Sequence, residues 1–378
     1  MKTTIDFDVI IIGGGLAGLT SAIHLSKNTV NVLLIEKHSY PKHKVCGEYI
    51  SNEVLPYFEY LEINPFGLGA QKIKRFLLST PQNKTIEADL PLGGFGISRY
   101  TLDSALAKKV QENGAKILQE AVVNIQFHND EFKVTTKNNQ KFTASIVIGA
   151  YGKRAALDAK MNRDFMKKKS PYLAVKTHAK GIFPNDLVAL HNFEGGYCGV
   201  SKVENDSINL CYIADFEIFK KYKDIDDFQE KVVFKNTFLK SVFKNSSPVF
   251  EDPITISQVS FASKYPVEQH ILMCGDTAGM IHPLCGNGMS MAIRSAQMAS
   301  QLIIDYKNEK IKSRELLEKA YIRDWNKEFK SRLKTGQLVA SLFRMNYFSE
   351  VLIGTLKMAP GLLPKIIKRT HGKPMIIK

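Results

Sequence analysis

The sequence predicts an α/β fold in which a parallel sheet carries an inserted, mostly antiparallel sheet and a helical C-terminal tail. Short β-branched apolar runs that end at glycine predict strands buried on both faces, at residues 7–12, 144–150 and 270–275. Apolar and polar residues instead alternate in 71–97 and 171–265, which is typical of antiparallel strands. Helical periodicity dominates between Gly288 and about Met358.

The first 36 residues form a complete strand–helix–strand unit. The run at 7–12 is followed by a helical pattern at 16–27 and a second apolar run at 31–36. A further helix is expected from Thr101 to Val110. We predict three parts of the chain: a nucleotide-binding domain (1–70, 98–165 and 266–305), a substrate domain (71–97 and 166–265) and a C-terminal helical region (306–378).

Composition excludes several classes of protein. The chain has 378 residues, 44% hydrophobic and 24% charged, so a large core is expected. The net charge of +15 comes from scattered lysines without any nucleic-acid-binding motif, so no nucleic-acid partner is expected. Five cysteines without CxxC spacing predict no disulfide framework and no metal site, and fit a reducing cytoplasm. We expect neither a signal peptide nor a spanning helix.

A glycine fingerprint lies between the first predicted strand and helix. Gly13, Gly15 and Gly18 form GxGxxG, in which the first makes a tight turn, the second admits a pyrophosphate and the third allows close packing. Leu16 and Ala17 begin the helix, whose N-terminus attracts phosphate. Glu36, at the end of the next strand, is expected to accept hydrogen bonds from ribose hydroxyls. This Rossmann-like pattern fits any dinucleotide.

A second segment narrows the ligand. Residues 274–279 read Cys-Gly-Asp-Thr-Ala-Gly, and 283–288 read Pro-Leu-Cys-Gly-Asn-Gly. This pair resembles the FAD-dependent superfamily (GR2-type fold) of aromatic hydroxylases, geranylgeranyl reductases and flavin-dependent halogenases. The resemblance implies that FAD is the cofactor and that Asp276, after Gly275, holds the ribityl chain. It also implies that backbone N–H groups lie beside the isoalloxazine ring at Gly286, Asn287, Gly288 and Met289.

A third segment resembles the R-x-x-L motif of this superfamily and implies that Arg99 contacts the cofactor. Lys37 and Val123 complete the predicted FAD-binding set. The sequence departs from the hydroxylases at Tyr151, which replaces the acid of their GADG segment. NAD(P)H is the expected electron donor. Lys153 and the adjacent Arg154 either meet an NADPH phosphate or form a solvent-facing basic turn.

Three residues are candidates for catalysis. Cys46 and Gly47 resemble a Cys-Gly pair that lies close to the flavin in geranylgeranyl reductases, so Cys46 is expected to line the site, with a buried structural cysteine as the alternative. Glu48 is a candidate acid or base, or else a member of a surface salt bridge. His282 either lies near the ring or makes a structural hydrogen bond.

Aromatic residues of the inserted sheet are predicted to line a substrate pocket: Phe193, Tyr197 and Tyr212. Tyr197 stands where reductases and halogenases carry a W-x-F/I-P motif, but the Trp and Pro are absent. This departure weakens a prenyl-reductase assignment and, more strongly, a halogenase one. The alternative is that all three rings belong to the core.

The predicted function is an FAD-dependent oxidoreductase that reduces C=C bonds, or otherwise oxidises or reduces an apolar isoprenoid or polyketide-like substrate. A flavin monooxygenase that hydroxylates an aromatic or polyketide compound is the alternative. A non-catalytic FAD redox carrier is a hypothesis of another class. The acid-free segment 351–378 also predicts either a peripheral membrane contact or a tail packed on the body.

Overall fold

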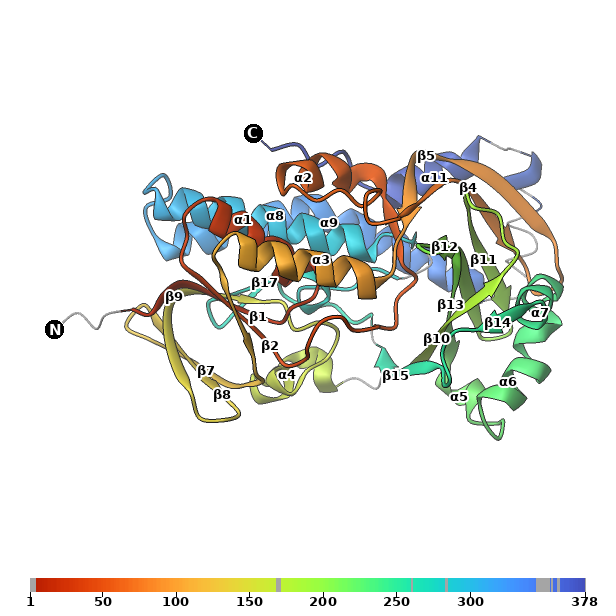
Figure 1. Ribbon diagram of the computed structural model, residues 1–378, viewed down its shortest axis with the longest axis horizontal. Coiled ribbons are helices and arrows are strands. Elements are labelled where there is room, and N and C mark those ends of the chain that lie inside the picture. Colours follow the sequence, from red (N-terminus) through yellow and green to blue (C-terminus); the bar gives the residue numbers. More distant parts are fainter. Residues whose placement is uncertain are drawn as a thin grey trace.

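The computed structural model describes residues 5–167, 171–259, 261–282, 285–344, 354, 356–358 and 361–377. Figure 1 shows two sheets side by side, with a layer of helices across one face of the first sheet. Pro283 and Leu284 of the predicted flavin loop, and most of 345–360, lie outside the described residues.

The first sheet contains eight strands within the described ranges, and its central five are parallel. In spatial order these are β17 (Ile271–Met273), β9 (Lys141–Gly149), β1 (Phe7–Ile12), β2 (Val32–Glu36) and β6 (Lys116–Gln119). The carboxyl ends of β1, β2, β9 and β17 therefore meet at one edge, where ligands bind in open α/β sheets. Antiparallel additions complete this sheet: β7 (Val122–His128), β8 (Glu131–Thr136) and β16 (Val267–Glu268).

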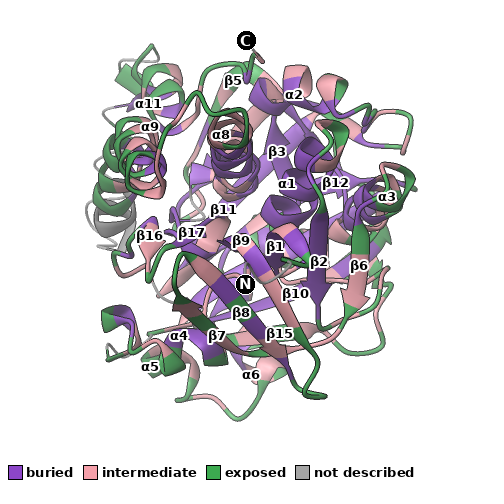
Figure 2. Ribbon diagram, turned by 90° about the vertical axis from the view of Figure 1, so that its left-hand side faces the viewer, coloured by how far each residue is buried: buried purple, intermediate pink, exposed green. Residues whose placement is uncertain are grey.

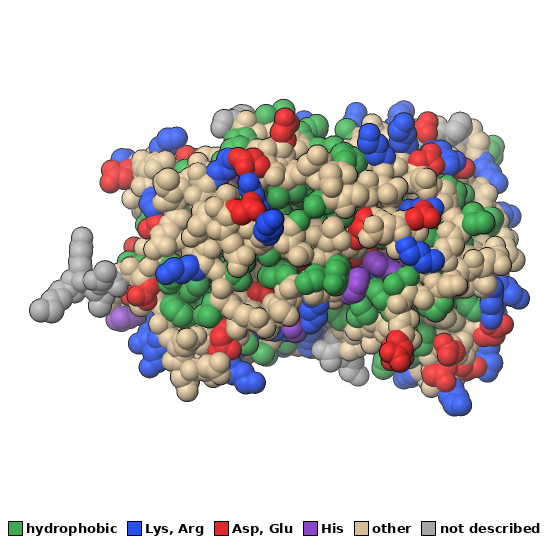
Figure 3. Space-filling model, in the orientation of Figure 1, with side chains coloured by type: hydrophobic (Ala, Val, Ile, Leu, Met, Phe, Trp, Pro, Cys, Tyr) green, Lys and Arg blue, Asp and Glu red, His purple; other side chains and the backbone are tan. Residues whose placement is uncertain are grey.

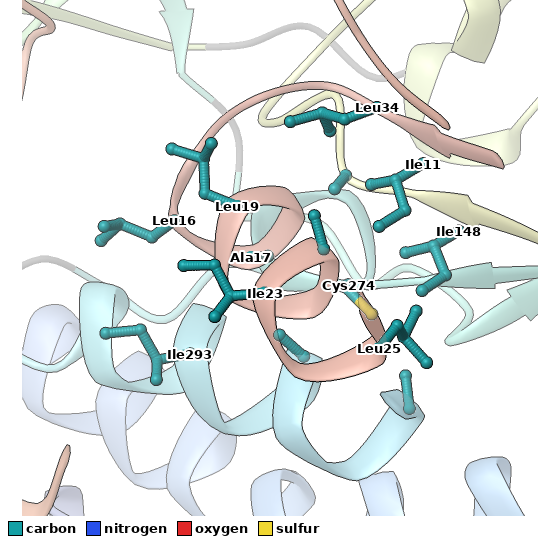
Figure 4. Packing of buried hydrophobic residues seen from close by; sticks show 14 of the residues in the cluster. Ile11, Leu16, Ala17, Leu19, Ile23, Leu25, Leu34, Ile148, Cys274 and Ile293 are labelled. Atoms are coloured by element: carbon teal, nitrogen blue, oxygen red, sulfur yellow. The ribbon is translucent and has the colours of Figure 1, made fainter. Parts of the chain in front are cut away.

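The central helix α1 (Leu16–Lys27) is buried from Leu16 to Leu25, because β-strands cover one side and helices the other. Its neighbours are α8 (Gly288–Lys307) and α3 (Arg99–Glu112), and α9 (Arg314–Arg344) packs on α8. Figure 4 shows apolar side chains of β1, β2, β9 and α8 gathered around α1, and Figure 2 shows the buried residues concentrated there.

The second sheet contains nine strands in the part of the chain that is described, and all its pairings are antiparallel except β4 with β11. The main path runs β14 (Ser246–Pro248), β10 (Tyr172–Gly181), β13 (Ser207–Asp215), β12 (Gly196–Val203), β11 (Leu187–Phe193), β4 (Gln71–Ser79), β5 (Thr85–Gly96) and β3 (Tyr49–Ser51). β15 (Ile254–Val259) pairs with β10. β3 lies within the predicted segment 1–70 but pairs with β5 of this sheet.

The two faces of the second sheet have different neighbours. One packs against three short helices, α5 (Phe216–Phe219), α6 (Ile225–Lys231) and α7 (Thr237–Lys244). The other faces α11 (Leu362–Thr370). Two further short helices are α2 (Leu55–Tyr60) and α4 (Ala156–Lys160). The predicted α/β class with an antiparallel insertion and a helical C-terminal region is confirmed, although 216–244 is helical where strands were expected.

Candidate FAD and substrate site

A cavity of about 900 Å³ begins at the carboxyl edge of the parallel sheet and extends under the second sheet. The turns that follow four parallel strands line its first half, after β1, β2, β9 and β17. The second half is lined by apolar side chains from the second sheet and α11. The cavity therefore joins a nucleotide-type edge to an apolar chamber.

Among the three fingerprint glycines of the turn after β1, Gly15 is the one that leaves room for a ligand. A Cβ atom on Gly13 would lie 2.4 Å from the Ala150 carbonyl oxygen, and one on Gly18 would lie 1.9 Å from the Gly13 oxygen. A Cβ on Gly15 would meet only Arg99 Nη2, at 3.7 Å. Gly15 is the N-cap of α1, and it lines the cavity together with Leu16 and Ala17.

Glu36 joins the glycine turn to the end of β2. Its Oε2 accepts the Gly14 N–H at 2.6 Å, and its Oε1 accepts the His38 N–H at 3.0 Å. The carboxylate is buried and lines the cavity beside Lys37. Since a carboxylate oxygen accepts more than one hydrogen bond, Glu36 retains capacity for a hydroxyl ligand.

Arg99, the first residue of α3, reaches the cavity as part of a charged group. Its Nε and Nη2 donate to the two oxygens of Asp103, both at 2.7 Å. Lys44 Nζ donates to the same carboxylate at 2.9 Å. Burial alone would raise the pKa of Asp103, but the charges of Arg99 and Lys44 hold it below its usual value. The group therefore carries net positive charge beside the glycine turn.

Asp276 lines the cavity after β17, in a turn fixed by its backbone. Gly275 has φ +60° and donates its N–H to Ser295 Oγ at 2.8 Å. Lys264 Nζ donates to the carbonyl oxygens of Asp276 and Lys153, at 2.6 and 2.7 Å. Burial lowers the pKa of Lys264 to about 8, against the opposing charge of Asp276. One buried amine thus ties together two of the turns that line the cavity.

The start of α8 contributes Gly286, Gly288 and Met289 to the cavity. Gly286 has φ +61°, a backbone conformation that favours glycine. Asn287 is placed differently: it is buried, and its Nδ2 donates to the Thr370 carbonyl oxygen at 2.9 Å. Its side chain therefore joins α8 to α11.

Cys46, Gly47 and Glu48 line the cavity where its two halves meet. Cys46 is partly buried and Glu48 is fully buried. Tyr151 faces the same cavity from the turn after β9, and its hydroxyl lies 3.6 Å from Met273 Sδ. Lys153 and Arg154 complete this wall.

A family model described as "Lycopene cyclase protein" matches residues 8–169, less than half of the chain. Two digeranylgeranylglycerophospholipid reductases are similar over most of the chain. That of Methanosphaera stadtmanae is 25% identical and is aligned over 83% of this chain and 79% of its own length. That of Methanococcus vannielii is 26% identical and is aligned over 90% of this chain and 87% of its own length. A monodechloroaminopyrrolnitrin halogenase from Pseudomonas fluorescens is 24% identical and is aligned over 79% of this chain and 61% of its own length.

The fold is shared with solved flavoproteins. A flavin-dependent brominase superposes with a TM-score of 0.80 at 18% identity, covering 96% of this chain and 93% of its own. These matches agree with the site geometry, in which the glycine turn and the Asp276 turn line one cavity. The chain belongs to the FAD-dependent oxidoreductase superfamily.

The cavity of this flavoprotein fits FAD. The N-terminus of α1 and Gly15 leave an open approach for the pyrophosphate, beside the positive charge of Arg99 and Lys44. Glu36 would accept the ribose hydroxyls, and Asp276 would hold the ribityl chain. Gly286, Gly288 and Met289 lie at the junction with the apolar chamber, where the ring is expected.

Some predicted residues do not line this cavity of the flavoprotein. Val123 is 40% exposed on β7, and its carbonyl oxygen accepts from Lys160 Nζ at 3.1 Å. Phe193 lies in the core on the other face of the second sheet, where its ring packs on Tyr212 and Phe228. Side chains alternate along a strand, so β11 directs Phe193 away from the cavity.

The other predicted aromatic and histidine residues divide between the cavity and the core. Tyr197 lines the cavity and packs near His282, with ring centroids 5.9 Å apart. Tyr212 touches the cavity wall, although its ring packs in the core beyond the sheet. His282 is buried outside the lining set, 4.5 Å from the Phe261 ring. Within the described residues, no group of His, Cys, Asp or Glu could hold a metal ion.

Most of the apolar wall was not foreseen. It comprises Phe76, Leu78, Leu90, Val188, Leu190, Ile213, Ile254, Ile256, Met280, Leu363, Ile366 and Ile367. These residues come from strands far apart in sequence, from α11 and, for Met280, from the loop before α8. A local signal existed for α11, where the mixture of apolar and basic residues indicates an amphipathic helix. That pattern does not show what the apolar face of the helix covers.

Proposed function

We propose that this flavoprotein is a reductase that adds hydrogen across a C=C bond of an apolar isoprenoid-like substrate. The observation that carries the proposal is the apolar chamber, which is continuous with the FAD edge and lined mainly by aliphatic side chains. Matches to two digeranylgeranylglycerophospholipid reductases over most of the chain support the same substrate class. The altered motif around Tyr197 leaves the particular substrate open.

The residues of the chamber act by binding and by excluding water. Leu190 and Ile213 on the second sheet face Ile366 and Ile367 of α11 across the apolar half of the cavity. Burial of an isoprenoid chain among such side chains contributes roughly 25 cal/mol per Å² of apolar surface. FAD, when bound, supplies the hydride chemistry. Cys46, at the junction, is the proposed proton donor to the second carbon.

We propose NAD(P)H as the electron donor, with Lys153 and Arg154 as the basic residues that meet its phosphates. Both line the cavity on the turn after β9. Stopped-flow bleaching of the flavin absorbance by NADPH, NADH and dithionite tests this donor. Substituting both residues by Gln should slow reduction by the nicotinamide but not by dithionite.

Product analysis under anaerobic conditions tests the reaction. Purified protein is loaded with FAD, reduced with dithionite and given geranylgeranyl lipids. A product that gains two hydrogen atoms per double bond without oxygen supports the reductase. A product that gains one oxygen atom, and only in air, overturns it in favour of the monooxygenase. Full reduction and reoxidation of FAD with every apolar substrate left unchanged would favour a redox carrier instead.

We also propose a peripheral membrane contact at α11. No described helix has the length and apolar character needed to cross a membrane. α11 turns Leu363 and Ile367 inward against the cavity, while Lys365, Lys368 and Arg369 are exposed. Figure 3 shows lysine and arginine spread over one whole face of the molecule, so net charge alone does not single out this surface. What favours α11 is that its inner face closes an apolar chamber.

Flotation with anionic vesicles tests this contact. Reversing Lys365, Lys368 and Arg369 to Glu removes about 3 kcal/mol of attraction and adds repulsion, so partitioning should fall by at least about 100-fold at low salt. The matched control reverses Lys133, Lys137 and Lys141, which are exposed along the β8–β9 hairpin and change net charge equally. Equal partitioning of the two triple variants would remove the membrane proposal and leave the reductase proposal intact.

A further inference from the structure

Glu48 adopts a backbone conformation that is unusual for its residue type. Its φ is +53°, in the left-handed region that favours glycine. The residue lies between Gly47 and the first residue of β3, and its carbonyl oxygen accepts the Ile97 N–H at 3.1 Å. Strained conformations of this kind persist only where the surrounding structure holds them, and they cluster at functional sites.

The Glu48 carboxylate is held by three donors from distant parts of the chain. Its Oε1 accepts the Arg99 backbone N–H at 2.8 Å and the Lys176 ammonium group. Its Oε2 lies 2.6 Å from His178 Nε2. The carboxylate and the Lys176 side chain are both fully buried. Burial alone would raise the pKa of Glu48, but the His178 hydrogen bond and the Lys176 charge lower it, so the group is an ionised acceptor at neutral pH.

The donors on the second sheet also hold the peptide groups before Glu48. Lys176 and His178 are two residues apart on β10, so their side chains share one face of the sheet. Lys176 Nζ also donates to the Lys44 carbonyl oxygen at 3.2 Å. Asn209 on β13, which pairs with His178, donates from Nδ2 to the carbonyl oxygens of Cys46 and Gly47, at 3.3 and 2.9 Å.

We propose that Lys176, His178 and Asn209 are positioning residues that clamp the Cys46–Gly47 segment into the cavity, with Glu48 as the anchor they hold. The clamp lets the substrate-binding sheet set the position of a segment on the cofactor side of the cavity. It rests on the proposed function only for the expectation that the flavin ring lies beside Cys46. It also explains why Lys176 is fully buried, since the Glu48 carboxylate balances its charge there.

The alkylation rate of Cys46 measures the clamp directly. Full-length protein is treated with iodoacetamide, with and without FAD, and modification of the Cys46 peptide is followed by mass spectrometry. Lys176→Met should raise this rate, and weaken FAD binding, by about 10-fold, as when a group supporting a site is lost. Lys180→Met is the matched control, because Lys180 is on the same strand and exposed. It should behave as wild type in both measurements.

A second pair of variants tests the backbone conformation. Glu48→Ala keeps the left-handed strain and loses the anchor, whereas Glu48→Gly loses the anchor and relieves the strain. The Gly variant should therefore retain more FAD binding than the Ala variant. The double variant Glu48→Gln with Lys176→Met removes the buried charges together, so it keeps the test available if Lys176→Met alone fails to fold.

The outcomes separate the clamp from the proposed function. The clamp is overturned if Cys46 is alkylated at the same rate in Lys176→Met, in the double variant and in Lys180→Met, and if the flavin spectrum is unchanged. That result leaves the reductase proposal standing, because alkylation needs neither substrate nor cofactor. Conversely, faster alkylation in a protein that reduces no lipid supports the clamp and counts only against the proposed reaction.

Discussion

Gly15→Ala should abolish tight FAD binding while leaving the protein folded. Gly15 has φ −87°, which alanine adopts without strain, and the nearest atom to its new Cβ would be Arg99 Nη2, at 3.7 Å. The methyl group would instead project into the cavity at the N-terminus of α1. It would therefore occupy the space where the pyrophosphate has to approach the helix.

The two effects differ in size. Alanine is a poorer N-cap than glycine, but it also restricts the unfolded chain, so the free energy of unfolding should change by at most about 0.5 kcal/mol. Displacing the pyrophosphate costs at least one charge-assisted hydrogen bond, about 2 kcal/mol, or roughly 30-fold in FAD affinity. Gly18→Ala is the contrasting variant. Its Cβ would lie 1.9 Å from the Gly13 oxygen, so overpacking should destabilise the fold by about 1–3 kcal/mol.

Urea unfolding of the proteins without FAD gives the stabilities, and fluorescence quenching during FAD titration gives the affinities. A Gly15→Ala protein that binds FAD within about twofold of wild type would refute the reasoning, because the phosphates could not then approach α1 at this position. Loss of both folding and binding would also refute it, since the structure leaves space for the methyl group.

Three further predictions concern the cavity and two buried titratable groups. Leu190→Trp should fill part of the chamber and raise KM for long isoprenoid substrates without changing FAD affinity. Phe193 lies outside the cavity, so Phe193→Ala should lower the free energy of unfolding by about 3–5 kcal/mol without changing substrate preference. Burial lowers the pKa of Lys264 to about 8 from 10.5. Between pH 8 and pH 10.5 the Lys264 amine is protonated in the unfolded chain but not in the folded protein. The free energy of unfolding of the wild type should therefore rise by about 3 kcal/mol across this window, and denaturant titrations of Lys264→Met should not show this rise. Burial likewise lowers the pKa of His24 to about 4 from 6.5, so stability should fall by about 3 kcal/mol as pH drops through this window, and His24→Gln should flatten the profile.

Elements set by local pattern were predictable. The helical pattern at 16–27 coincides with α1, and the apolar runs at 7–12 and 31–36 correspond to β1 and β2. Both runs are short and apolar, as buried parallel strands are, and glycines close the first of them; a few consecutive residues carry these signals. The helices between 216 and 244 were missed, although Asp215, Asp224 and Asn236 accept backbone N–H bonds at their N-termini as N-caps.

Side-chain directions across the second sheet were harder to predict. Phe193 and Tyr197 lie four residues apart in a run of aromatic and small residues, yet only Tyr197 lines the cavity, because a turn separates β11 from β12. Alternation fixes which residues of one strand share a face, but not which face meets the ligand. That choice depends on how α5–α7 and α11 cover the two sides of the sheet.

The sequence alone determined the cofactor edge of this flavoprotein, because the glycine turn, Glu36 and the Asp276 turn are short segments whose backbone geometry follows from their own residues. Tertiary structure decided the rest of the site. Glu48 is a fully buried anchor rather than a surface carboxylate, because β10 brings Lys176 and His178 to it from more than a hundred residues away. The apolar chamber exists because α11 covers one face of the second sheet. Such contacts depend on strand pairing and helix docking, which no local pattern encodes.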